Sequence, residues 1–154
     1  MKKFILIVSY IFICTLTFAQ SANDYIEMTR EVIKAEKKAA VAEAMQLTDA
    51  ESQPFWDLYN EYQGKQYPVH NKRIAIIKDF AENYENLSDE KADELWTNYM
   101  KFQQELLKVK ISYYKKFKKI LPAGKAALFM QTENKIEALI NASLAAEIPL
   151  IETR

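Results

Sequence analysis

The sequence is poor in the residues that make turns. Its 154 residues include two glycines, Gly64 and Gly124, and four prolines. Hairpins, sandwiches and barrels need many turn residues, so this scarcity argues against a β fold. Alanine, leucine, glutamate, lysine and glutamine, the residues that favour helices, are abundant. The sequence therefore predicts an all-α fold.

Cysteine is almost absent, because Cys14 is the only one. It lies within Met1–Ala19, which reads as a secretory signal peptide: Lys2 and Lys3 precede an apolar run, and Ala19 offers a small residue for cleavage before Gln20. A membrane anchor is the alternative, but the run is shorter than the roughly 20 residues of a spanning helix. A lipoprotein fits less well because Ile13 precedes the cysteine. We expect a periplasmic protein without disulfides, with one all-helical domain over residues 20–154.

The sequence also lacks a charge excess and any recognisable catalytic set. Lysine and arginine number 21, as do aspartate and glutamate, and removal of Lys2 and Lys3 leaves 19 minus 21, or −2. This balance argues against a nucleic-acid partner. His70 is the only histidine, and the two glycines stand too far apart to form a phosphate loop. We expect no enzyme activity, no cofactor and no metal site.

Two segments forty positions apart repeat the start of a helix. Leu47, Asp49, Trp56 and Tyr59 recur as Leu87, Asp89, Trp96 and Tyr99. In the first copy Thr48 and Glu51 have the spacing of a capping box, and in the second copy Ser88 is the expected cap. The repeat predicts two long helices that begin alike and face each other.

Apolar periodicity predicts four helices. The first spans about 24–46, the second begins at Thr48, the third begins at Ser88 and ends near Ile120, and the fourth runs from Pro122 to about Ala146. In the second helix a stripe with spacings of three and four runs through positions 55, 59, 62, 66, 69, 73, 77, 80 and 84. All of these are apolar or aromatic except Gln66 and Arg73. The third helix has the stripe 92, 95, 99, 102, 106, 109, 113, 117 and 120.

The links between these helices, and the proline within the second one, predict how the helices are arranged. The short link at residues 85–87 predicts an antiparallel helical hairpin flanked by the first and fourth helices. Pro68, four residues after Gly64, predicts a kink or a short break at 64–68. The apolar tail at residues 148–151 follows the last helix, and we expect it to dock on the body.

A basic and aromatic run near the end of the third helix is the candidate site for a client or partner. Its residues are Tyr114, Lys115, Lys116, Phe117, Lys118 and Lys119. Lysines at a helix carboxyl end also offset the helix dipole, which is a sufficient structural reason for them. Trp56 and Trp96 offer two readings as well: a pair of core residues, or an exposed aromatic platform.

The two helix starts, Leu47-Thr48-Asp49-Ala50-Glu51 and Leu87-Ser88-Asp89-Glu90-Lys91, resemble the paired Leu-Thr-x-x-Gln motifs of the Spy/CpxP group of periplasmic helical proteins. This sequence has glutamate where the group has glutamine, and its second copy departs further. The resemblance implies long kinked helices in a hairpin, an antiparallel homodimer, and an ATP-independent chaperone or envelope-stress accessory. Some relatives sense metals through histidine-rich sites, which this sequence lacks.

The leading functional hypothesis is therefore an exported helical protein that binds unfolded or partly folded proteins. A structural adaptor for one envelope protein is the second hypothesis, and a metal-responsive sensor is the third. We expect a homodimer. Proximity to a membrane surface is an alternative use of the basic run.

Overall fold

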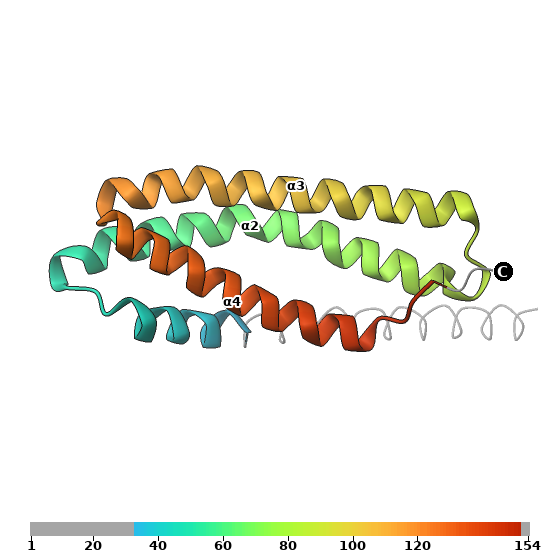
Figure 1. Cartoon of the computed structure of the whole chain (residues 1–154), viewed down its shortest axis with the longest axis horizontal. Coiled ribbons are helices and arrows are strands. Elements are labelled where there is room, and N and C mark those ends of the chain that lie inside the picture. Colours follow the sequence, from blue (N-terminus) through green and yellow to red (C-terminus); the bar gives the residue numbers. More distant parts are fainter. Residues whose placement is uncertain (1–32, 152–154) are drawn as a thin grey trace, which may run out of the picture. The chain divides into compact units, whose positions relative to one another are not determined.

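The computed structural model describes residues 33–151, and every regular element in this range is a helix (Figure 1). The chain divides into two units, one ending at Glu43 and the other beginning at Ala44. Of the first unit, residues 33–43 are described and are helical. The predicted signal peptide, its cleavage site and residues 24–32 of the predicted first helix lie outside the described residues. The all-α prediction is confirmed.

The second unit contains three long helices. They are α2 (Asp49–Asn83), α3 (Asp89–Ile120) and α4 (Ala123–Glu147), and the 3-10 turn η1 (Tyr84–Asn86) separates the first two. No helix in the described range is long and apolar enough to span a bilayer.

The predicted capping box begins α2. The Thr48 backbone N–H donates to the Glu51 carboxylate at 2.9 Å, and the Glu51 N–H donates to the Thr48 carbonyl at 3.0 Å. The same carboxylate forms an ion pair with Lys125 at the start of α4. One glutamate therefore both starts α2 and ties it to α4.

Pro54 and Pro68 both lie inside α2, which continues without interruption as a gently curved helix (Figure 1). The break expected as one alternative at residues 64–68 is wrong. Pro68 removes one backbone donor. Gln66 and Val69, on either side of it, are both buried, at 3% and 7% exposure. Tertiary packing of the buried stripe therefore keeps the helix intact where local propensity alone favours a break.

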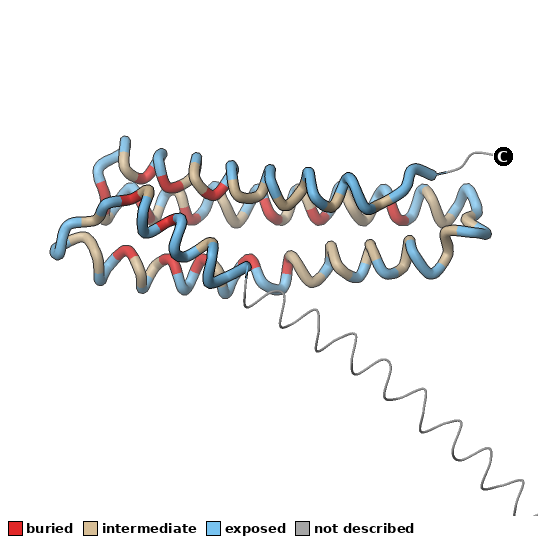
Figure 2. The backbone as a smooth tube through the Cα atoms, turned by 90° about the horizontal axis from the view of Figure 1, so that it is seen from below, coloured by how far each residue is buried: buried red, intermediate tan, exposed pale blue. Residues whose placement is uncertain are grey.

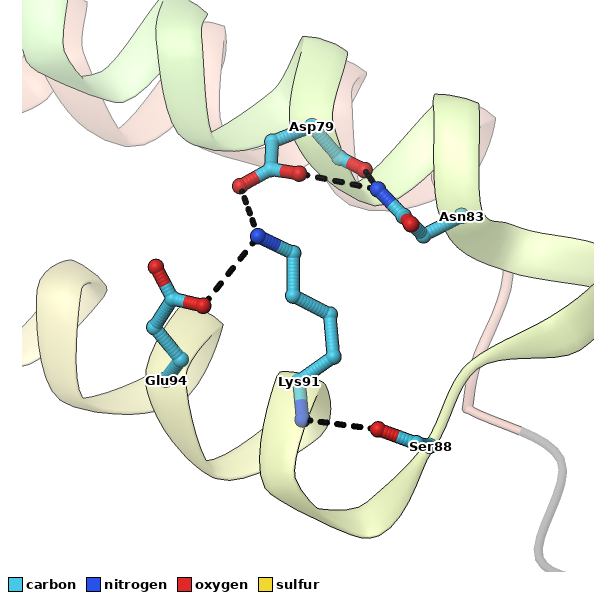
Figure 3. A network of polar contacts seen from close by, with 5 residues as sticks. All are labelled: Asp79, Asn83, Ser88, Lys91 and Glu94. Carbon is cyan, nitrogen blue, oxygen red and sulfur yellow. Dashed lines mark hydrogen bonds and ion pairs between the residues drawn. The ribbon is translucent and has the colours of Figure 1, made fainter.

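Polar contacts fix the turn between α2 and α3 (Figure 3). The Ser88 hydroxyl accepts from the Lys91 N–H at 3.2 Å and caps α3, as predicted. The Lys91 ammonium lies 2.7 Å from Asp79 on α2 and 3.1 Å from Glu94. The Asn83 amide donates to the Asp79 carboxylate at 2.9 Å and to its backbone carbonyl at 2.8 Å. Asp79 thus joins the end of α2 to the first turn of α3.

The helices α2 and α3 lie side by side and run in opposite directions. Lys91, near the start of α3, pairs with Asp79, near the end of α2. Lys116, near the end of α3, pairs with Glu61, in the first half of α2, at 2.7 Å. Partner numbers fall along one helix as they rise along the other.

An aromatic cluster forms the main core at the end of the unit where α4 begins. The Phe117 and Phe129 ring centroids are 4.4 Å apart, and Phe55 meets Phe129 edge-on at 5.3 Å. Tyr59 and Tyr62 also contact Phe129, at 6.0 and 5.8 Å between centroids. Figure 2 shows the buried positions recurring along the helices, most of them in this half. A second cluster of Val69, Phe102 and Leu106 continues the core between α2 and α3.

The helix α4 packs mainly through its first half. Phe129 and Glu133 are buried, and Glu137 forms an ion pair with Lys110 of α3. After Glu147 the chain leaves the helix, and Leu150 is 88% exposed. The expected docking of the apolar tail is therefore wrong, because Pro149 ends the helix and no described element covers Leu150.

Candidate functional site

The six residues of the predicted surface separate into a buried and an exposed set. Phe117 has 0% exposure and lies in the aromatic core, so its assignment to a binding surface is wrong. It continues the buried stripe of α3, four residues after Tyr113, and this helical spacing turns it toward α2 and α4. The run at residues 114–119 is a helix segment, and its members therefore face different directions.

Lys116 also belongs to the fold. Its ammonium pairs with Glu61 at 2.7 Å and lies 4.3 Å from the Tyr113 ring centroid. The Tyr113 hydroxyl donates to Glu61 Oε1 at 2.8 Å. Hydrogen bonds from Lys116 and Tyr113 hold the pKa of Glu61 below its usual range, while the bond to Glu61 raises the pKa of Lys116. Lys116 and Tyr113 therefore join α3 to Glu61 of α2.

Lys115, Lys118 and Lys119 are exposed, and Tyr114 is half-buried. The Lys118 ammonium lies over the Tyr114 ring, 4.9 Å from its centroid. Within the described part of the chain, no salt bridge involves any of these three lysines. They keep a local positive charge at the carboxyl end of α3, where the helix dipole favours cations.

The structure reveals exposed apolar side chains along the same helix. We call Trp96, Met100, Leu107 and Ile111 the outer stripe, and their exposed fractions are 62%, 45%, 56% and 49%. Trp96 stacks on Tyr99, with ring centroids 5.5 Å apart. The core reading of Trp96 is therefore wrong, while Trp56 is half-buried beside Phe55 at 5.0 Å between centroids. Members of the outer stripe lie four or seven residues apart, which is the sequence signal that could have identified them.

Three lysines accompany the outer stripe. Lys101 and Lys108 directly follow Met100 and Leu107, and Lys115 follows Tyr114 seven residues later. All three are exposed. A row of cations thus borders apolar surface along α3, and the arrangement suits a ligand that is both apolar and acidic.

A polar group also lies inside the core. Gln66 donates from Nε2 to the Tyr62 hydroxyl at 2.8 Å. Burial, followed by the charge of Glu133, raises the pKa of both Tyr59 and Tyr62 above the ordinary tyrosine value. These hydroxyls are held protonated, so the group fits a structural role. His70 lies near Phe102, at 6.1 Å between ring centroids. Across residues 33–151, no three acidic, histidine or cysteine side chains are grouped to hold a metal ion.

Comparisons with protein families, with curated proteins and with solved structures give no match to this chain.

Proposed function

We propose that this protein is an exported helical binding protein that holds partly unfolded proteins without ATP. The outer stripe of α3 carries the proposal, because it combines four exposed apolar residues with a bordering row of lysines. The resemblance of the two helix starts to the Spy/CpxP group supports the same function.

Unfolded clients expose apolar segments, and a protein that holds them needs exposed apolar surface to bind those segments. Large exposed apolar surfaces on soluble proteins commonly mark binding sites for proteins or ligands. Trp96 offers the largest contact area of the stripe, and Met100 adapts its shape to irregular segments. Clients with apolar segments can therefore cover the stripe without a specific sequence.

The lysines add attraction over a longer range. Clients rich in acidic residues approach a basic surface faster, and salt weakens this effect because the Debye length is about 8 Å at physiological ionic strength. Capture should therefore slow as salt concentration rises.

An aggregation assay with purified protein tests the function. The protein should delay aggregation of several unrelated clients at equimolar concentration. Replacing Lys115 and Lys118 with glutamine should slow capture of acidic clients and leave the helical circular dichroism signal unchanged. Replacement of Lys65 and Lys135, exposed lysines on α2 and α4, is the matched control and should leave capture unchanged. Failure of the wild-type protein to protect any client would overturn the proposal.

The exposed tail favours a second candidate, an adaptor for one envelope protein. Leu150 and Ile151 are 88% and 46% exposed at the end of the described chain. An adaptor should bind one partner through this tail and lose it on replacement of Leu150 with aspartate. A holding protein should protect unrelated clients regardless of that replacement.

A further inference from the structure

Three lysines form a regular row beside the outer stripe of α3. Lys101, Lys108 and Lys115 recur every seven residues, and all three are exposed. At about 100° per residue, the three positions fall within about 40° of one another around the helix and lie about 90° from the outer stripe. Within residues 33–151, none of their ammonium groups takes part in a hydrogen bond or an ion pair. The lysine row is therefore a line of available cations along one edge of an apolar surface.

The helix α3 offers no carboxylate to balance this row. Glu105 is the only acidic residue of α3 after Glu94. Its carboxylate pairs with Lys72 of α2 at 2.5 Å, so it is turned toward the neighbouring helix. The lysine row thus attracts acidic groups on whatever covers the outer stripe.

The spacing of the row distinguishes a helical occupant from an extended one. Residues seven apart in a helix lie about 10.5 Å apart along its axis. A second helix lying along α3 presents its own residues seven apart at the same interval, so acidic side chains repeated every seven positions would meet all three lysines. Three residues of a strand span about 10 Å, but the third faces the opposite side. One face of a strand would therefore meet Lys101 and Lys115 and miss Lys108.

The apolar residues of the outer stripe have helical spacing as well. Trp96 and Met100 are four residues apart, Met100 and Leu107 are seven apart, and Leu107 and Ile111 are four apart. Side chains at these intervals interdigitate with the apolar stripe of an amphipathic helix. From Trp96 to Lys115 the surface is about 28 Å long, which matches about three heptads of a partner helix.

The charge at the start of α3 argues against an anionic membrane as the occupant. Asp89 and Asp93 continue the line of the outer stripe toward the start of the helix, and both are exposed. A flat anionic bilayer lying along the stripe would bring these carboxylates close to lipid phosphates, and like charges repel. A helical segment can end before it reaches them.

We infer that the outer stripe takes its clients as amphipathic helices that lie along α3 and carry acidic residues every seven positions beside their apolar face. This inference rests on the proposed function and names the class of client segment that the site selects. Partly folded chains contain such segments before their helices have packed against one another. The apolar contacts would supply most of the affinity, and the lysine row would select the acidic flank and set the register.

Synthetic peptides test the selection. The first peptide has about three heptads, with leucines along one face and a glutamate beside that face in each heptad. The matched control has the same composition, with the glutamates on the face opposite the leucines. Fluorescence anisotropy should show that the first peptide binds about tenfold more tightly, because only its glutamates reach the lysine row. Circular dichroism should show a gain of helix on binding, and a central proline in the first peptide should abolish binding.

A charge exchange tests the register. Lys108→Glu should weaken binding of the first peptide by about fivefold, because it places like charges opposite each other. A peptide whose central glutamate is replaced by lysine should recover that affinity with the variant and bind the wild type less tightly. Lys65→Glu, a reversal of an exposed lysine on α2, is the matched control and should have little effect. Unchanged circular dichroism of each variant would show that the fold is intact.

The outcomes separate this inference from the proposed function. Equal affinity for the two peptides, or no recovery in the charge exchange, would overturn the inference. If the protein still delayed aggregation of unrelated clients, the holding function would stand and its clients would be bound in another form. Displacement of the first peptide by phosphatidylglycerol vesicles would assign the stripe to a membrane and overturn the inference. Peptide affinity that falls as the protein concentration rises would assign it to a second copy, with the same consequence.

Discussion

Glu51 links local capping to tertiary structure at the scale of a single residue. Its pKa is lowered from 4.5 to about 2, first by the hydrogen bond from Lys125 and then by the backbone N–H of Thr48. A depressed carboxyl pKa stabilises the fold above about pH 4.5, and this contribution is lost as the pH falls toward 2. Protonation of Glu51 removes the negative charge that attracts the Lys125 ammonium and strengthens the hydrogen bond from Thr48.

We therefore predict that Glu51→Gln is destabilised near pH 7 and that its difference from the wild type shrinks between pH 5 and pH 2. Urea unfolding followed by circular dichroism at several pH values measures this. Glu82→Gln, an exposed change near the end of α2, is the control. A difference that stays constant with pH would contradict the assigned role of the charge.

Gly64 is a weak point in α2 that the fold does not require. A Cβ at this position would meet nothing within 4 Å. Glycine inside a helix costs about 0.5–1 kcal/mol relative to alanine, so Gly64→Ala should raise the free energy of unfolding by about that amount. Denaturant titration measures the change. Gly124→Ala, in the first turn of α4 where space is also open, should give a smaller gain, and a loss at Gly64 would mean that α2 needs flexibility there.

At the scale of an element, α3 has one face that packs in the core and another that is exposed to solvent. Phe117 faces inward with 0% exposure, whereas Leu107 faces outward with 56%. Phe117→Ala should lower the free energy of unfolding by about 3–5 kcal/mol, because it removes a ring from the aromatic core. Leu107→Ala should change it by less than about 0.5 kcal/mol in the monomer. Comparable losses for the two variants would mean that the outer stripe is already covered within one chain.

The buried stripes of α2 and α3 could be read from the sequence because spacing alone defines them. Phe55, Tyr59 and Tyr62 on α2, and Phe102 and Phe117 on α3, are buried as the three-and-four spacing indicates. The candidate surface was harder to predict because the composition of a segment does not say which way each side chain faces. The run at residues 114–119 looked like one patch, yet the helix turns Phe117 into the core and pairs Lys116 with Glu61.

At the scale of the whole molecule, export governs where any binding takes place. We predict that mass spectrometry of the protein from its native host will find a chain that begins at Gln20. The motive is the pattern of Lys2, Lys3 and the apolar run ending at Ala19. An intact amino terminus in the soluble cytoplasm would contradict the periplasmic location and the client class that depends on it.

The sequence by itself determined the helical class, the capped starts of α2 and α3 and the composition of the core. These follow from local rules: few turn residues, capping side chains at fixed offsets, and a period of 3.6. Only the tertiary structure decided that α2 passes through Pro68, that Phe117 is core and that Trp96 is exposed. Each of these depends on which neighbouring helix covers a given face, and a one-dimensional pattern does not contain that contact.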